Sequence, residues 1–466
     1  MKKIKKYLEF FAIATTFAIG SMNYMEAVTL KITCRSKGKE LELLRKAIEE
    51  WMVKHDGEHK VEIVTLPHAS NECFALYQQW FGAESFDVDI LQLDVAWVGI
   101  FSDYLLALDE YCAGQLDMND YFDIIKENMY GNDGRIIALP LYTDCGMIYY
   151  RRDLLEKYAK PVPQTLEEMY DTALYIQNEE RKDESKQNKF YGFVLQAKAF
   201  EILTCNFAEI LDACGGAIVK NDVVEINSAR GSYAIEFMIK CQKNIMSRSV
   251  LNYSEEDARG VFQSGNAVFM RNWPYAYALM NDPSTAVAGK IGVMTIPPSA
   301  VNGKESGVLG GWFMGVSRYS KHKELAADLA MFISGKAQQK IRVEFSYLPT
   351  FKSLYSDPDV LKMNPFVANM QKPLLNAVAR PSKVFGKNYT KASSEIFNTI
   401  NTILTESIDN TEDFNANKHM NRLNEKLSRL LQEKQQKKIT NTAEDDSKTG
   451  FFRSILNSIM RFFGKH

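Results

Sequence analysis

The sequence of 466 residues lacks most of the short motifs that mark a chemical site. Its cysteines form no C-x-x-C pair, which argues against the common zinc and dithiol redox sites. It shows no phosphate-binding loop, metal-ligand motif or nucleophile signature, so motifs indicate no class of enzyme. The formal net charge is only −2, which gives no electrostatic reason to expect nucleic acid as a partner. We therefore expect neither a metal nor a cofactor.

The cysteines are odd in number and scattered along the chain. They are Cys34, Cys73, Cys112, Cys145, Cys205, Cys214 and Cys241. In an oxidising compartment at least one of seven thiols stays free or pairs between chains. The interpretation we favour is that they are small buried hydrophobic residues.

The N-terminus has the layout of a signal peptide. Four lysines within the first six residues form a basic head, and an apolar stretch leads to small residues near Ala27. The apolar stretch is interrupted by Glu9 and is too short for a membrane span of about 20 residues. We expect residues 1–27 to be a signal peptide for export to the periplasm, with a retained N-terminal anchor as the alternative.

The length and the order of the expected elements indicate an α/β protein with two lobes. We predict strands at 28–33, 61–66 and 88–93, with helices at 40–53 and 72–82 between them, as in a parallel sheet covered by helices. A second unit follows, with strands at 146–150 and 188–195 and a helix from Arg152. Thr165 and Glu168 form the pattern of a capping box at the start of another helix.

Two further segments complete the expected architecture. A strand in 291–298 is predicted to return to the first unit, and residues 321–431 are predicted to be mostly helical. Residues 432–450 are polar and charged, which predicts a linker. Residues 451–466 group their apolar side chains on one helical face among basic residues, which suits a helix lying on a membrane surface. A tail that docks on its own protein or stays loose is an equal alternative.

Six segments, taken together and in this order, resemble a known family. They are 76–79 (LYQQ), 87–97 (DVDILQLDVAW), 139–155 (LPLYTDCGMIYYRRDLL), 262–277 (FQSGNAVFMRNWPYAY), 309–312 (LGGW) and 379–381 (ARP). The chain resembles, from about Leu30 to Leu431, the extracellular solute-binding proteins of the maltose/trehalose type, family 1 of the sugar-binding components of ABC importers.

The resemblance implies a two-lobed periplasmic-binding-protein fold of type II, similar to maltose-binding protein, with a discontinuous hinge and a cleft between lobes. Combined with the element pattern, it gives the following expected organisation: 1–27 signal peptide, 28–140 first lobe, 141–288 second lobe, 289–320 first lobe again, 321–431 second lobe again, 432–450 linker and 451–466 basic amphipathic helix.

The resemblance also implies ligand-binding residues, and their chemistry suits a sugar. Sugar hydroxyls need donors and acceptors, and sugar C–H patches lie well against aromatic rings. Asp94 ends a strand where α/β sheets place ligands, although a carboxylate there also caps helices. Tyr142 and Asp144 fall at the crossing between lobes and are expected to supply a ring and a second carboxylate.

The aromatic and glycine positions complete the expected site. Trp273 is expected to be a stacking platform stiffened by the following proline, and Tyr275 is a weaker candidate. Gly310 and Gly311 are expected to let bare backbone approach the sugar, while Trp312 closes over it. Core packing is the alternative for that second indole.

Two charged residues have equally good structural explanations. Arg380 offers a fork of donors suited to adjacent hydroxyls, and the alternative is an ion pair between lobes. Glu40 matches an acidic contact of the family, but an acidic residue at a helix N-terminus is favourable by itself. The chain also departs from the family: many relatives carry an arginine before the LYQQ stretch, where this sequence has Cys73.

The expected function is therefore binding without chemistry. A disaccharide or short oligosaccharide of the trehalose, maltose or sucrose type would be captured between lobes and delivered to the membrane permease of an ABC transporter. Two alternatives stay open at this point. One is a sugar-binding sensor or accessory protein that docks on a membrane partner, and the other is a glycoside hydrolase with Asp94 and Asp144 as its carboxylate pair.

Overall fold

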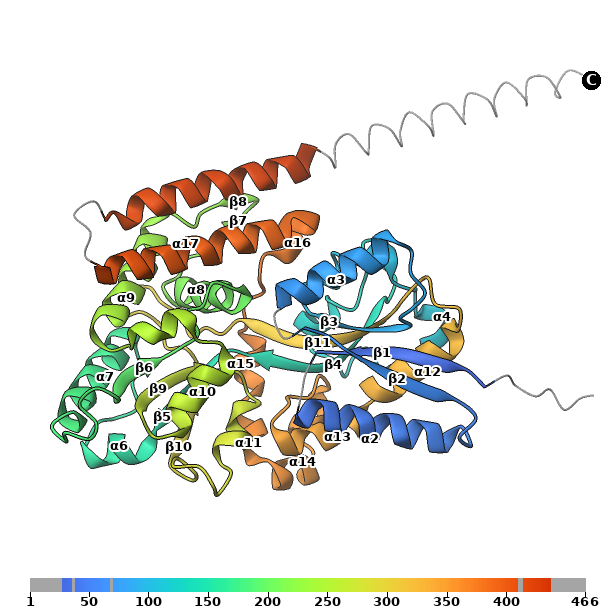
Figure 1. Ribbon diagram of the computed structural model, residues 1–466, viewed down its shortest axis with the longest axis horizontal. Coiled ribbons are helices and arrows are strands. Elements are labelled where there is room, and N and C mark those ends of the chain that lie inside the picture. The colour runs from blue at the N-terminus through green and yellow to red at the C-terminus, as the bar shows by residue number, and fades with distance from the viewer. Residues whose placement is uncertain (1–26, 36–37, 68–69, 410–413, 437–466) are drawn as a thin grey trace, which may run out of the picture.

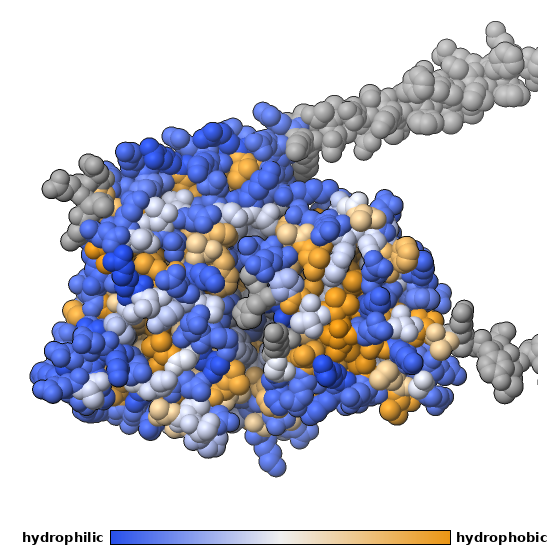
Figure 2. Space-filling model, viewed as in Figure 1, coloured by the Kyte–Doolittle hydropathy of each residue, from blue (hydrophilic) through white to orange (hydrophobic). Residues whose placement is uncertain are grey.

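The computed structural model describes residues 27–35, 38–67, 70–409 and 414–436. The expected signal peptide up to residue 26, and the expected basic helix at 451–466, lie outside the described residues. The chain forms two lobes side by side, with the N-terminal strands in one and the C-terminal helices stacked over the other (Figure 1). In the same view, apolar surface residues gather mainly over the first lobe (Figure 2).

The first lobe is built on a five-stranded sheet of order β2-β1-β3-β11-β4. Its strands are β1 (Thr29–Cys34), β2 (Lys60–Thr65), β3 (Ile90–Asp94), β4 (Ala138–Cys145) and β11 (Leu309–Val316). β1 is parallel to both β2 and β3, whereas β11 runs antiparallel to β3 and β4. The strand–helix alternation predicted between residues 28 and 93 is confirmed.

The helices of the first lobe cover both faces of this sheet. They are α2 (Lys39–Lys54), α3 (Ser70–Gly82), α4 (Asp109–Cys112), α5 (Asp123–Lys126), α12 (Lys323–Ser334) and α13 (Lys336–Arg342). α2 buries Leu44, Ile48 and Trp51 at helical spacing, which is the apolar stripe expected of a helix packed on a sheet.

The second lobe contains a four-stranded sheet of order β10-β5-β9-β6. Its strands are β5 (Met147–Arg151), β6 (Tyr191–Val194), β9 (Ala267–Asn272) and β10 (Ile291–Met294), and a small hairpin adds β7 (Val219–Lys220) and β8 (Val223–Val224). β10 pairs antiparallel with β5, Ile291 opposite Arg151. The prediction that the strand at 291 returns to the first lobe is therefore wrong, because local alternation does not reveal a partner strand.

The helices of the second lobe include two that begin where the sequence predicts them, at Arg152 and after Thr165. The helices of this lobe are α6 (Arg152–Lys157), α7 (Leu166–Glu180), α8 (Glu201–Ala213), α9 (Ala229–Asn244), α10 (Glu255–Gln263), α11 (Ala276–Met280) and α17 (Tyr389–Asp409). At α7 the Thr165 hydroxyl accepts from the Glu168 amide at 3.1 Å, as predicted. The Glu168 carboxylate turns to the amide of Gln164 instead of that of Thr165, so only half of the capping box forms.

Three neighbouring segments join the lobes. β4 passes through Gly146 into β5, and the Gly146 amide donates to the Val308 carbonyl just before β11 at 3.1 Å. The second segment ends at Val308, and the third contains Val378. These two segments run side by side, because Leu309 N donates to Val378 O at 2.9 Å. The chain thus re-enters the first sheet at Leu309 rather than at residue 289.

The predicted assignment of 321–431 to the second lobe is only partly correct. α12 packs against β11, β4 and α2 in the first lobe, whereas α17 packs against α8 and α9 in the second. Between them lie α14 (Pro358–Met363), α15 (Gln371–Leu375) and α16 (Ser382–Phe385). A last helix covers 416–436, so the first residues of the expected linker are helical. Among the described helices, none is long and apolar enough to cross a membrane.

All seven cysteines are buried. Burial raises the pKa of Cys73 and Cys112 to about 11 and that of Cys214 to about 12. Burial also raises the pKa of Cys145, Cys205 and Cys241. The interpretation of the cysteines as small core residues is therefore the one the structure supports.

These thiols are expected to resist alkylation in the folded protein, because a buried thiol is neither accessible nor ionised at pH 8. Iodoacetamide should modify none of the seven in native protein and all seven in guanidinium chloride, as counted by intact mass. Rapid modification of native protein would contradict the burial.

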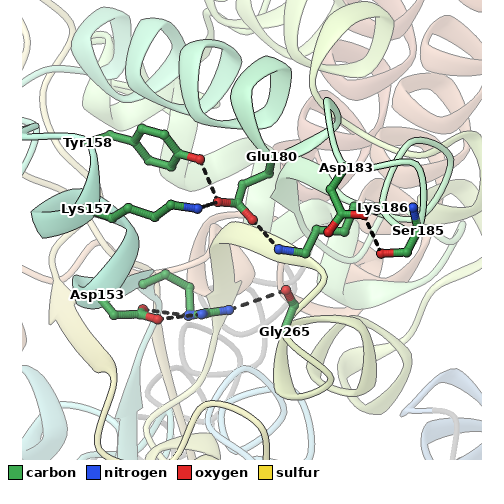
Figure 3. A network of polar contacts seen from close by, with 9 residues as sticks. Asp153, Lys157, Tyr158, Glu180, Asp183, Ser185, Lys186 and Gly265 are labelled. Atoms are coloured by element: carbon green, nitrogen blue, oxygen red, sulfur yellow. Dashed lines mark hydrogen bonds and ion pairs between the residues drawn. The ribbon is translucent and has the colours of Figure 1, made fainter.

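A buried carboxylate organises the far side of the second lobe (Figure 3). Glu180, at the end of α7, has only 2% of its side chain exposed. It accepts from Lys157 and Lys186 and, at 2.7 Å, from the Tyr158 hydroxyl. Burial alone would raise the pKa of Glu180, but these donors outweigh burial and lower the pKa to about 2.

Glu180→Gln should reduce the free energy of unfolding at pH 7 by about 1–3 kcal/mol, because hydrogen bonds to a charged group are lost. A carboxyl with a lowered folded-state pKa stabilises above the unfolded-state value of about 4.3, and the contribution fades as pH falls through about 2. The difference from wild type, measured by urea denaturation, should therefore shrink between pH 5 and pH 2. Glu179→Gln, on the adjacent, more exposed carboxylate, is the control and should change little. An equal effect of both variants, or a difference independent of pH, would contradict the assignment.

Candidate functional site

A cavity of about 530 Å³ lies between the two lobes. Its wall from the first lobe includes the start of α2, the ends of β1 and β3, and the facing parts of β4 and β11. Its wall from the second lobe includes the starts of α8 and α10 and the segment after β9. The structure brings all of the sequence-predicted residues to this cavity: Glu40, Asp94, Tyr142, Asp144, Trp273, Tyr275, Gly310, Gly311, Trp312 and Arg380.

The pairing of β4 with β11 fixes the floor of the cavity. Trp312 lies opposite Tyr142, and Gly310 opposite Asp144. Gly311 has a φ of 128°, and a methyl group there would lie 2.7 Å from the Tyr142 carbonyl oxygen. Only glycine satisfies both conditions. Gly311 therefore serves the strand geometry, in addition to any approach of backbone to a ligand.

Asp144 is a buried carboxylate whose Oδ1 has no hydrogen-bond partner among the described residues. The pKa of this carboxyl is raised well above its ordinary value, first by burial and next by the nearby charge of Glu40. Buried polar atoms are normally paired. An unpaired carboxylate oxygen at a cavity wall is therefore suited to accept from a donor on a bound molecule.

Glu40 and Tyr142 form one polar unit on the first lobe. The Tyr142 hydroxyl donates to Glu40 Oε1 at 3.0 Å, and the side-chain amide of Gln92 donates to the same oxygen. Tyr347 packs against Tyr142 with ring centroids 4.8 Å apart. Glu40 thus accepts from two donors on the sheet, which orients its carboxylate toward the cavity.

Arg380 joins the two lobes. It donates to Asp94, at the end of β3 in the first lobe, and to Glu201, at the start of α8 in the second lobe, the latter at 2.8 Å. Asp94 also accepts from the Ala96 amide at 2.8 Å. The ion pair between lobes that was the alternative for Arg380 is therefore present, whereas Asp94 caps a turn after β3 and not a helix. Only Nε of Arg380 lacks a partner among the described residues.

Two indoles from different lobes border the cavity. Trp312 of β11 packs edge-on against Trp97, with ring centroids 5.9 Å apart, and carries the guanidinium of Arg35 4.8 Å from its ring centre. Trp273 follows β9 and remains half-buried. A methyl group on Gly310 would lie 3.0 Å from Trp273 Cζ3, so the second-lobe indole reaches the first-lobe strand across the cavity.

Several cavity residues were missed at the sequence level. They include Arg35, Lys39, Glu201, Glu255, Arg259 and Tyr347. Arg35 directly follows β1, and a guanidinium at a strand end was a signal available in the sequence. Cys73, at the position where an arginine was expected, donates to the Pro67 carbonyl and is absent from the cavity wall. Arg35 therefore brings a guanidinium to the first-lobe wall, although the arginine expected near Cys73 is absent.

Tyr275 and Glu255 lie at the second-lobe wall. The Tyr275 hydroxyl donates to Glu256 at 2.7 Å, so this phenol is already engaged. Glu255 Oε2 is buried and has no partner among the described residues. Both lobes thus present an unpaired carboxylate oxygen to one cavity.

Comparisons with known proteins agree with this architecture. A family model described as a bacterial extracellular solute-binding protein matches residues 46–369. A probable ABC transporter-binding protein of Deinococcus radiodurans is 36% identical over 407 residues, which are 86% of this chain and 94% of that protein. The structure of maltose-bound MalE3 of T. maritima superimposes with a TM-score of 0.77 at 34% identity, covering 86% of this chain and 100% of that one.

A third relative has a narrower match. The galactooligosaccharide-binding protein of Bacillus subtilis is 27% identical over 242 residues, which are 49% of this chain and 53% of that protein. The hydrolase alternative loses its basis, since the family binds solutes and Asp94 is held in an ion pair with Arg380. The chain belongs to the bacterial extracellular solute-binding proteins, as a sugar-binding component of an ABC transporter and not as an enzyme.

Proposed function

We propose that the cleft captures a disaccharide or short oligosaccharide of the maltose, trehalose or sucrose type and that the chain delivers it to a membrane permease. The observation that carries this proposal is the pair of indoles, Trp273 and Trp312, which border one cavity from opposite lobes. Aromatic faces suit the C–H patches of sugar rings. The cavity volume of about 530 Å³ is in the range of small-molecule sites, about 300–1,000 Å³.

The unpaired polar atoms supply the complementary hydrogen bonds. Within the described part of the chain, Asp144 Oδ1 and Glu255 Oε2 are acceptors without donors, and Arg380 Nε is a donor without an acceptor. Sugar hydroxyls both donate and accept, so one ligand satisfies all three groups. The three residues come from the first lobe, the second lobe and the connecting segment, so a bound sugar would favour the closed arrangement.

The charge of the cavity wall favours a neutral sugar. Six carboxylates line the cavity against four basic side chains, and Arg380 is already committed to Asp94 and Glu201. An anionic sugar, such as a uronic acid or a sugar phosphate, would add negative charge to a wall on which acidic side chains outnumber basic ones. The bound maltose of the T. maritima relative supports the same preference.

Export and delivery complete the proposal. The expected signal peptide, cleaved after Ala27, would place the mature protein in the periplasm. There the closed, sugar-bound form is the one that a permease recognises, because a ligand with contacts to both lobes adds to the stability of that arrangement.

Maltose, trehalose or sucrose should raise the melting temperature, by mass action on the folded state. Trp273→Ala and Trp312→Ala should each weaken binding about 10- to 100-fold, or about 1.4–2.8 kcal/mol, in isothermal titration calorimetry. Trp80→Ala, a half-buried indole of α3 outside the cavity wall, is the matched control and should bind normally. If the wild-type chain binds none of these sugars and no other neutral oligosaccharide, the proposal is wrong.

Arg380→Met should lower the free energy of unfolding by about 3–5 kcal/mol, because it leaves two largely buried carboxylates without their cation. Urea denaturation measures the change. Arg135→Met, at an exposed ion pair with Asp133, provides the control and should change stability by less than about 1 kcal/mol. A small effect at Arg380 would show that the bridge between lobes contributes little.

A further inference from the structure

A fully buried ion pair lies beneath the cavity without lining it. Arg271 of β9 and Glu209 of α8 have 2% and 1% of their side chains exposed. Arg271 Nε donates to Glu209 Oε2 at 2.8 Å, and Nη2 donates to Oε1. Neither residue belongs to the cavity wall. The pair is therefore too deep to touch a ligand directly.

Stability alone is a weak explanation for this pair. Removing two charges from water costs several kcal/mol per ion, and well-packed apolar residues of similar volume often serve as well or better. Arg271 also leaves Nη1 without a partner among the described residues. The pair is better explained by what the two side chains hold in place.

On one side the pair supports the indole of Trp273. The guanidinium carbon of Arg271 lies 3.9 Å from the Trp273 ring centre, which is a close cation–π contact in a desolvated site. The indole's backbone is fixed as well, because the Asn272 side chain accepts from Trp273 N and the Tyr149 hydroxyl donates to Trp273 O, both at 2.8 Å. These contacts hold the backbone at Trp273 and cover one face of its ring.

On the other side the pair reaches the connection between lobes. Glu209 Oε1 accepts from the Val308 amide at 3.2 Å, in the second crossing segment. At the first crossing, a methyl group on Gly146 would lie 1.7 Å from the same oxygen. Only glycine at position 146 therefore leaves room for the Glu209 carboxylate between the two crossing segments.

We propose that Glu209 and Arg271 are positioning residues that tie the sugar-stacking orientation of Trp273 to the crossing segments at Gly146 and Val308. When these segments rearrange, the Glu209 carboxylate moves with them. The Arg271 guanidinium follows its ion-pair partner, and the Trp273 ring follows the guanidinium on which it stacks. This inference rests on the proposed function, since it assumes that Trp273 stacks on a sugar.

The test compares saccharide affinity in single and double variants. Arg271→Met keeps most of the side-chain volume and removes the guanidinium, and Kd is measured by titration calorimetry well below the melting temperature. The probe is whichever of maltose, trehalose and sucrose gives the largest thermal shift with wild type. When Trp273 is present, we expect Arg271→Met to raise Kd about tenfold relative to wild type. When Arg271→Met is added to the Trp273→Ala variant, we expect Kd to change less than twofold relative to Trp273→Ala alone.

The controls separate positioning from general destabilisation. Glu180→Gln also breaks a buried ion-pair network in the second lobe, but it is remote from the cavity wall. It should lower stability and leave Kd unchanged. If Arg271→Met does not fold, Arg271→Lys replaces it, because it keeps the charge for Glu209 but not the planar stack, and the same comparison applies.

The outcomes distinguish the two proposals. If wild type binds a saccharide and the Arg271 variant binds it equally well, the positioning role is wrong and the proposed function stands. An equal rise in Kd with and without the indole would also overturn the positioning role, because the effect would not pass through Trp273. If wild type binds none of the three sugars nor any other neutral oligosaccharide, the proposed function fails and the inference fails with it.

Discussion

The pairing of β4 with β11 is the constraint on which the rest of the structure depends. These two antiparallel strands supply the floor of the cavity; β4 leads through Gly146 into β5 of the second lobe, and β11 begins directly after the crossing segment that ends at Val308. The pairing requires glycine at 311, where the backbone has a positive φ and a methyl group would strike the neighbouring strand. Because the same residues form the sheet and the cavity floor, the position of Asp144 and Trp312 is as rigid as the sheet itself.

The largely buried charges beside the cavity are paired across the two lobes. Arg380 lies between Asp94 and Glu201, which come from different lobes and would otherwise face the cavity as unpaired carboxylates. The carboxylates left without such a partner, Asp144 and Glu255, are then the ones whose hydrogen bonds remain open to a ligand.

The sequence predicted the local elements and the composition of the cavity better than the path of the chain. Alternation and capping located β1 to β3 and the start of α7 at Thr165, because these signals lie within a few neighbouring residues. The partner of β10 and the lobe to which α12 belongs depend on contacts distant in sequence, and those predictions failed or were incomplete. Resemblance found Trp273 and Trp312 but not Arg35, which no quoted motif contains.

The Glu209–Arg271 pair illustrates why the deeper part of such a site cannot be read from sequence. Arg271 lies within a strand whose six residues are all buried, and in isolation an arginine there contradicts the apolar pattern. Its position is explained only by Glu209 on α8 and by the bare Cα of Gly146, which together give the guanidinium an ionic partner. A residue that contradicts the local hydrophobic pattern but has a partner far away in the sequence often marks a functional position. Here that place lies between the segments that cross between the lobes and the indole of Trp273, the residue proposed to contact the sugar.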